Sequence, residues 1–267
     1  LKEFNMAATI FCITSELDGS YYLSKEAIRE MSAYGIDIES HTLTHPHLNK
    51  MNYDKQLAEL ITSKKTLEEI TGKEINSIAY PFGDFNDDSV KAAKEAGYEG
   101  IGLRAETYVD ALNEGLFDKD ILAILDKYDM KVTEVEYIVQ WAEEHRSYEQ
   151  KYKEQLCFHM CELFNVKQIN CGLMENYSVE YTAQKLRELC HRAGKYIIGV
   201  EPMPYSGIPD VKKGWAVVKA ADCENAKLIL DTWHWVRANQ PIELSVLEGI
   251  PADKIVSIQI NDVWERP

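Results

Sequence analysis

Short apolar runs rich in β-branched residues alternate with longer amphipathic stretches along the whole chain. This alternation is typical of repeated βα units. The short runs recur at intervals of about 30 residues, the length of one βα unit, which favours mostly parallel strands closed into a TIM-like α/β barrel. The nine predicted strands are Ala7–Thr14, Ile36–Thr42, Ser77–Phe82, Gly100–Arg104, Val132–Ile138, Gln168–Gly172, Ile197–Met203, Leu228–Trp233 and Ile255–Asn261.

The amphipathic stretches between these runs carry helix signals. Asp54–Thr71 places apolar side chains at helical spacing, and Asp87–Gly97 begins with two acidic residues and ends on glycine. Both features are typical of helix termini. A standard barrel has eight strands, so either one of the nine runs is not a barrel strand or the barrel closes irregularly.

Two histidines four residues apart, His41 and His45, follow the second predicted strand in the segment H-T-L-T-H-P-H-L. Neutral imidazoles at this spacing can converge on one divalent ion if the loop turns helically. The alternative is a surface loop that happens to be rich in histidine. The well-formed strand before the pair and the run Y-P-F-G that ends the following strand favour the metal site.

The two segments H-T-L-T-H-P-H-L and Y-P-F-G-D-F-N-D resemble the polysaccharide deacetylase (NodB-homology) family, over residues 1–99. The resemblance implies that His41 and His45 bind a divalent metal together with an aspartate. It also implies that Tyr80–Gly83 line a groove in which Tyr80 contacts an acetylated oligosaccharide. The family's Asp-Asp pair has no counterpart in this sequence. Because that pair supplies the general base and the third ligand, we do not expect deacetylation as the family usually performs it.

Acidic residues end two successive strands in the second half of the chain. Glu201 ends its run in G-V-E-P-M-P, and about 30 residues later Asp231 ends the next in L-D-T-W-H-W. Charged residues inside apolar strands are costly to bury unless they are paired or bound to a cation. Acids at the ends of consecutive barrel strands point into one mouth, where oxygen ligands suit Mg²⁺ or Mn²⁺. The alternative is that loop amides satisfy both carboxylates.

The motifs V-E-P-M-P-Y, L-I-L-D-T-W-H-W and I-V-S-I-Q-I-N-D resemble the xylose-isomerase-like TIM-barrel sugar isomerases and epimerases, over residues 100–267. The resemblance implies a metal on Glu201 and Asp231, with Glu201 as catalytic acid/base. Gln259 stands where a metal-binding histidine is common, and His234 matches a residue that usually contacts a substrate oxygen. The family's last strand, with a final glutamate that binds metal and transfers protons, has no counterpart here.

Other side chains near these motifs allow two interpretations. Trp233 and Tyr205 are candidates for stacking on a sugar, although core packing explains each equally well. Glu134 and Glu136 share one face of their predicted strand by alternation, and that face either lines the mouth or points away from it.

Composition limits the classes of partner that the chain is expected to bind. The formal net charge of −15 argues against nucleic acid and anionic membrane, because both require a basic surface. A small sugar or an acetylated oligosaccharide is the expected ligand, and unclosed strand edges would favour a homo-oligomer. The six cysteines form no C-x-x-C pair, and Cys157 and Cys161 fit core packing in a helix better than a metal clip. With no need for disulfides and no membrane-spanning apolar run, a cytoplasmic location is expected.

The sequence leaves three functional hypotheses open. The first is a metal-dependent sugar isomerase or epimerase that transfers a proton next to a carbonyl. The second is a metal-dependent polysaccharide deacetylase. The third is a catalytically inactive hybrid barrel, engineered or truncated, because each site lacks an acid that its chemistry needs. All three use a divalent metal (Mn²⁺, Mg²⁺, Co²⁺ or Zn²⁺), and we expect two distinct metal centres. We also expect Gly100–Arg104 to pair with Ser77–Phe82 across the join near residue 100.

Overall fold

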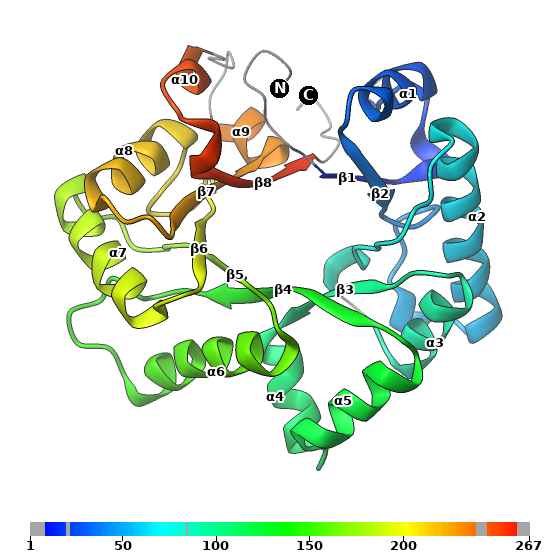
Figure 1. Cartoon of the computed structure of the whole chain (residues 1–267), viewed down its shortest axis with the longest axis horizontal. Coiled ribbons are helices and arrows are strands. Elements are labelled where there is room, and N and C mark those ends of the chain that lie inside the picture. The colour runs from blue at the N-terminus through cyan, green and yellow to red at the C-terminus, as the bar shows by residue number, and fades with distance from the viewer. Residues whose placement is uncertain (1–8, 20–21, 84, 239–244, 261–267) are drawn as a thin grey trace. The chain divides into compact units, whose positions relative to one another are not determined.

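A computed structural model describes residues 9–19, 22–83, 85–238 and 245–260. Strands and helices alternate along this part of the chain (Figure 1). The described residues form two compact units. We call residues 9–101, 119–131 and 259–260 the N-terminal unit, and residues 102–118 and 132–258 the C-terminal unit.

In the N-terminal unit, β1 (Thr9–Cys12) and β2 (Asp37–Ser40) are parallel neighbours. The last two residues of β8 pair with β1 on its other side, also in parallel. Helix α2 packs its buried residues Leu60 and Leu67 against this part of the sheet. The helices of the unit are α1 (Lys25–Ala33), α2 (Tyr53–Thr71), α3 (Asp87–Glu95) and most of α5 (Asp118–Lys127). The predicted helices Asp54–Thr71 and Asp87–Gly97 are therefore confirmed with small shifts at their ends.

The predicted strand Ser77–Phe82 is wrong. Pro81 has no amide hydrogen to donate to a neighbouring strand. Phe82 has φ of 60° within the 3-10 helix Pro81–Gly83, a left-handed conformation that an extended strand does not allow. The remaining eight predicted strands each coincide with an observed one, although most of their ends move.

Two isolated bridges remain where the ninth strand was predicted. Ile78 pairs in parallel with Ser40 of β2, and Ser77 pairs in parallel with Gly100 at the start of β3. The buried carboxylate of Glu39 accepts the backbone N–H groups of Ser77 (2.7 Å) and of its preceding residue (3.0 Å). The predicted pairing across the join is thus confirmed at one residue pair, Ser77 with Gly100. The Glu39 side chain accepts two backbone N–H groups that a neighbouring strand would otherwise accept.

The strands of the C-terminal unit follow the order β8-β7-β6-β5-β4-β3, and the pairs from β4 to β7 are parallel. This confirms mostly parallel strands in an α/β arrangement. The strands that lie wholly or mostly in this unit are β3 (Gly100–Arg104), β4 (Lys131–Ile138), β5 (Gln168–Cys171), β6 (Ile197–Val200), β7 (Ala226–Asp231) and β8 (Ile255–Ile260). The helices are α4 (Ala105–Asn113), α6 (Tyr148–Phe164), α7 (Val179–Ala193), α8 (Val211–Ala221), α9 (Thr232–Ala238) and α10 (Ser245–Glu248).

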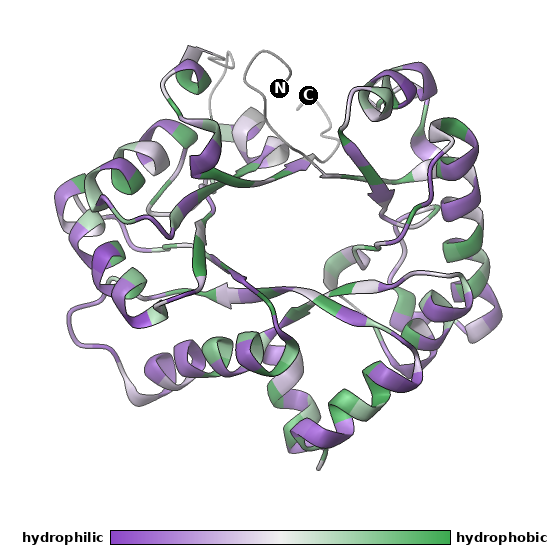
Figure 2. Cartoon of the chain, in the orientation of Figure 1, coloured by the Kyte–Doolittle hydropathy of each residue, from purple (hydrophilic) through white to green (hydrophobic). Residues whose placement is uncertain are grey.

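Each long helix of the C-terminal unit carries both hydrophobic and hydrophilic residues, so one face can be buried while the other meets water (Figure 2). Cys157 and Cys161 lie on the buried face of α6, and their thiols are free. Burial raises the pKa of the Cys157 thiol to about 12. The core-packing interpretation of this cysteine pair is confirmed. Within the described ranges, no helix has the length and apolar character needed to cross a bilayer.

A buried carboxylate joins α6 to α7 behind β5 and β6. Glu154 of α6 is almost fully buried and accepts two hydrogen bonds from Arg192 of α7, from Nε at 2.7 Å and from Nη2 at 2.9 Å. Arg146, which precedes α6, reaches the same carboxylate at 2.9 Å and is itself 9% exposed. Glu154 thus pairs with two arginines at once, and its contact with Arg192 ties α6 to α7.

We predict that Glu154→Ala destabilises the protein by about 3–5 kcal/mol, because it leaves the buried Arg146 without an opposite charge. Arg192→Ala should cost less, since Arg192 is 35% exposed and Arg146 still neutralises Glu154. Urea unfolding of the two variants measures both values. Equal losses in the two variants would contradict this account of the network.

Candidate functional site

Glu201 and Asp231 stand at neighbouring strand ends because β6 and β7 are parallel and in register, with Val200 opposite Leu228. Glu201 directly follows β6, and its backbone N–H donates to the carbonyl of Cys171 at 2.9 Å, extending the ladder with β5 by one residue. Asp231 is the last residue of β7. The two carboxylate residues are only 8% and 7% exposed, so the burial of charge expected from the sequence is real.

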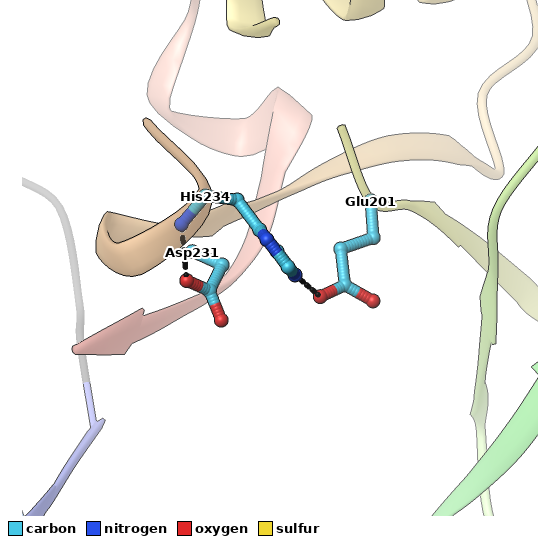
Figure 3. Close-up of side chains that lie close together, drawn as sticks. All are labelled: Glu201, Asp231 and His234. Atoms are coloured by element: carbon cyan, nitrogen blue, oxygen red, sulfur yellow. Dashed lines mark hydrogen bonds and ion pairs between the residues drawn. The ribbon is translucent and has the colours of Figure 1, made fainter. Parts of the chain in front are cut away.

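His234 completes a cluster with these two acids. Asp231 Oδ1 accepts the backbone N–H of His234 at 2.9 Å and thereby caps the first turn of α9. That turn brings His234 Nε2 to 3.4 Å from Glu201 Oε1 (Figure 3). The sequence predicted His234 as a substrate-binding residue, and the structure places its imidazole beside both predicted metal ligands.

The cluster has the geometry and the chemistry of a cation site. One ligand atom from each of Glu201, Asp231 and His234 lies within 4.8 Å of the other two. Ligand atoms about 2.1 Å from one ion stand about 3–4 Å apart, so side-chain movements on the order of 1 Å would close the cluster around an ion. A nitrogen and two carboxylate oxygens suit Zn²⁺, Mn²⁺, Co²⁺ or Mg²⁺. These residues therefore fit a divalent metal.

Of the aromatic residues predicted for sugar stacking, Tyr205 lies beside the cluster. The residue is 61% exposed, and its ring meets the His234 ring edge-on, with the centroids 5.7 Å apart. Desolvation and the negative charges of Glu201 and Asp231 raise the pKa of its hydroxyl. Trp233 lies in α9, and its side chain falls outside the described residues.

Gln259, the remaining predicted ligand, is a half-buried residue of β8. It belongs to the N-terminal unit, whereas Glu201, Asp231 and His234 belong to the C-terminal unit. Its role as a metal ligand stays a prediction.

A second layer of acids lies near Glu201 in the C-terminal unit. The buried amide of Asn170 in β5 donates to Glu134 Oε2 at 3.1 Å and to Glu136 Oε1 at 3.0 Å. Burial, followed by repulsion from Glu136, raises the pKa of Glu134 to about 7. Burial also raises the pKa of Glu136, with a further contribution from the charge of Glu201. The alternation that put both acids on one face was correct, and that face is the one toward Asn170.

Asn170 and Tyr137 could not be selected from the sequence. Tyr137 follows Glu136 in β4, and its hydroxyl lies 3.8 Å from Met203 Sδ, two residues beyond Glu201. Neither residue belongs to a motif. The only signal in the sequence was the spacing of Glu134 and Glu136, which indicated that β4 carries polar side chains on one face.

The histidine pair lies in the N-terminal unit. The ring nitrogens His41 Nε2 and His45 Nε2 are 3.1 Å apart. Two nitrogens that share one tetrahedral zinc ion at about 2.0–2.1 Å stand roughly 3.3 Å apart, so the pair matches a shared cation. His41 Nδ1 is 2.8 Å from the carbonyl of Ala79, which fits an N–H donor there and leaves Nε2 as the metal-facing nitrogen. Burial lowers the pKa of His41 to about 4, which keeps the ring neutral.

The surroundings of the histidine pair are partly as predicted. Among the described residues, only Glu201, Asp231 and His234 form a group of three ligand atoms, so no acidic third ligand joins the histidine pair there. Tyr80 points its hydroxyl at the carbonyl of Ser89 in α3, at 3.5 Å, and its contact with a substrate stays a prediction. The exposed ring of Phe82 stacks on His47, with the centroids 4.0 Å apart.

Comparison with known families gives two matches. The family described as Xylose isomerase-like TIM barrel matches residues 90–267, more than half of the chain. The family described as Polysaccharide deacetylase matches residues 1–101. Both resemblances predicted from the motifs are confirmed, and the two matches overlap over the segment that contains most of α3 and the start of β3.

Curated relatives match the first part of the chain. YxkH of Bacillus subtilis (strain 168), which is assigned as a polysaccharide deacetylase, is 34% identical over 117 residues, or 44% of this chain and 42% of that protein. The poly-beta-1,6-N-acetyl-D-glucosamine N-deacetylase of Staphylococcus epidermidis is 33% identical over 113 residues, or 37% of this chain and 39% of that protein. The chain thus spans less than half the length of these relatives.

Solved structures match the fold of the larger part. The IOLI protein, whose crystal structure holds a zinc atom, has a TM-score of 0.54 at 16% identity, covering 65% of this chain and 66% of that one. A xylose isomerase domain protein from Alicyclobacillus acidocaldarius has a TM-score of 0.52 at 15% identity, covering 66% and 68%. Identities this low show the fold alone. The chain is therefore an α/β protein that belongs to the xylose isomerase-like TIM barrel family, with a first segment that matches the polysaccharide deacetylases.

Proposed function

We propose that Glu201, Asp231 and His234 bind a divalent cation and that this centre acts on a small sugar as a metal-dependent isomerase or epimerase. The observation that carries the proposal is the convergence of one nitrogen and two carboxylate oxygens within 4.8 Å. Two of these residues come from adjacent strand ends, where α/β barrels place their chemistry. Membership of the xylose isomerase-like family supports the same class of substrate.

The chemistry divides between the cation and the chain. When bound, a divalent cation polarises a carbonyl oxygen and so makes the hydrogen on the adjacent carbon more acidic. Glu201 accepts that proton and returns it on the same face to the neighbouring carbon, while the proton of the adjacent hydroxyl passes to the former carbonyl oxygen, which isomerises the sugar. Epimerisation, which inverts one centre, would need a second acid to deliver a proton to the opposite face. Tyr205, with its exposed ring beside His234, stacks on the apolar face of the sugar.

A second candidate function rests on the histidine pair. The 3.1 Å separation of His41 Nε2 and His45 Nε2 suits a second divalent cation in the N-terminal unit. The deacetylases that match this segment include one named for poly-beta-1,6-N-acetyl-D-glucosamine, which supports an acetylated oligosaccharide as ligand. A base for deacetylation is not among the residues gathered there, so this centre is the weaker of the two candidates.

We predict that Asp231→Asn weakens the binding of Mn²⁺ to the metal-stripped protein by roughly 100-fold or more, because it removes a charged ligand. His41→Asn should leave this binding event unchanged, since the two centres use different residues. Isothermal titration with Mn²⁺ measures both variants. Loss of all bound metal in either variant alone would contradict two separate centres.

For activity, we predict that Glu201→Gln lowers any isomerase or epimerase rate by about 10² to 10⁴, the usual cost of removing a general acid/base. A panel of ketoses with Mn²⁺, Mg²⁺ or Co²⁺ is the assay, and Asp253→Asn, an exposed surface change outside the cluster, is the control. Acetate release from chitooligosaccharides that is lost in His41→Asn would favour the second candidate. A folded protein that binds metal but turns over neither class would support the hybrid without catalytic activity.

The raised pKa of Glu134 predicts a pH dependence of stability. A carboxyl whose pKa is higher in the folded than in the unfolded protein favours folding while it is protonated. Its contribution is fully present below the unfolded value of 4.5 and is lost as the pH rises through about 7. Glu134→Gln cannot ionise and still accepts the Asn170 hydrogen bond. Between pH 5 and pH 8 the variant should lose less stability than the parent, by on the order of 1–3 kcal/mol. Urea unfolding in EDTA measures the two slopes, and parallel slopes would contradict the prediction.

A further inference from the structure

Two polar side chains, Glu59 and Ser63, stand one helical turn apart on the buried face of α2. Glu59 is 8% exposed and Ser63 is fully buried. The Ser63 hydroxyl oxygen lies 2.8 Å from that of Ser40, the last residue of β2, and His41 follows directly. A buried carboxylate is costly unless hydrogen-bond donors reach its oxygens. The position of Glu59 therefore requires partners in the same region.

The donors that reach Glu59 come from the residue before the second histidine. Glu59 Oε2 accepts the backbone N–H of Thr44 at 2.8 Å, and Glu59 Oε1 accepts the Thr44 hydroxyl at 2.7 Å. Each carboxylate oxygen thus takes one donor of the same residue, directly before His45. Helix α2 therefore holds this segment at the residue that precedes each histidine.

The loop between the two histidines has a conformation that depends on such contacts. Thr42 has φ of 71° and His45 has φ of 58°, in the left-handed region that residues with a side chain rarely adopt. Thr42 Oγ1 accepts the backbone N–H of His45 at 3.0 Å and closes the loop from within. Residues in this region persist where the surrounding structure fixes them. The two hydrogen bonds to Glu59 fix the loop from the side of α2.

We infer that Glu59 is a positioning residue for the histidine pair. Through Thr44 it holds the ring of His45 in place, so that its Nε2 faces Nε2 of His41 at the observed 3.1 Å. The inference rests on the second candidate function only in taking this pair as a cation site. A purely stabilising role for Glu59 would lower the stability of its variants without changing how the two rings face each other.

The first test measures Co²⁺ binding at the histidine pair in an Asp231→Asn background, in which the other proposed centre is weakened. Glu59→Gln leaves one acceptor oxygen for the two donors of Thr44, and we expect it to weaken Co²⁺ binding about 10- to 100-fold. Thr44→Val, which loses the hydroxyl, should act in the same direction, and Thr44→Ser, which keeps both donors, should bind like the parent. The matched control is Glu69→Gln, an exposed position of the same helix. Parental affinity in Glu59→Gln would overturn the inference.

The second test uses no metal and observes the two rings directly. His41 Nδ1 donates to the carbonyl of Ala79 at 2.8 Å, so its Nε2 is free to accept from Nε2–H of His45. Nitrogen-15 NMR of the ring nitrogens in EDTA, at mildly alkaline pH, should show a single tautomer for each ring of the parent protein. Glu59→Gln should give His45 a mixture of tautomers, whereas Glu69→Gln should keep the parental pattern. An unchanged pattern in Glu59→Gln would equally contradict a positioning role.

A double-mutant cycle tests the hydrogen bond itself. Glu59→Gln, Thr44→Val and the double variant are unfolded with urea in EDTA, and we expect their losses of stability to be non-additive because the two side chains share one bond. Additive losses would remove the basis of the inference. If the Asp231→Asn protein binds no Co²⁺, the second candidate function fails, while the NMR pattern and this cycle still decide the role of Glu59.

Thr44→Val also covers the case in which Glu59→Gln does not fold. Thr44 is exposed, so its substitution leaves no cavity in the core. In that case the Co²⁺ titration and the NMR measurement are read from Thr44→Val against Thr44→Ser. We expect weaker Co²⁺ binding and mixed His45 tautomers in Thr44→Val alone. Parental behaviour of Thr44→Val in both measurements would overturn the inference.

Discussion

The parallel register of β6 and β7 is the constraint on which the candidate centre depends. It sets Val200 opposite Leu228, and the residues that follow bring two carboxylates to the same edge of the sheet. Burying two negative charges side by side is costly without a compensating cation or strong hydrogen bonds. His234 supplies part of that compensation, through its backbone N–H to Asp231 and its ring beside Glu201. A divalent ion would supply the rest, which gives the arrangement a physical reason to bind one.

The same principle organises the layer next to Glu201. Glu134 and Glu136 face the single amide of Asn170, and burial raises the pKa of both acids. Holding a proton there lowers the charge that surrounds Glu201. The region therefore balances its acids in two ways, by partial protonation in one layer and by the proposed cation in the other. Its charge, and with it the stability of the C-terminal unit, should depend on pH near neutrality.

The regular spacing of the strands and the acidic residues at their ends could be predicted from the sequence, because both follow from local patterns. Apolar runs mark β6 and β7, and Glu201 and Asp231 interrupt them at their ends. The same pattern wrongly predicted a strand at residues 77–82, because the apolar residues there resemble one. Pro81 and the positive φ of Phe82 end the pairing after two isolated bridges. Tyr137 and Asn170 could not be predicted. Their importance lies in contacts between strands that are far apart in sequence, and no spacing rule reports such contacts.

The most direct test of the central claim is anomalous diffraction at the manganese edge from crystals of the intact chain soaked in Mn²⁺. The account predicts a peak about 2.0–2.3 Å from a carboxylate oxygen of Glu201, from one of Asp231 and from a ring nitrogen of His234. It further predicts that this peak disappears in Asp231→Asn crystals grown and soaked in the same way. Density for manganese only at His41 and His45, or none at the Glu201 cluster under saturating Mn²⁺, would contradict it.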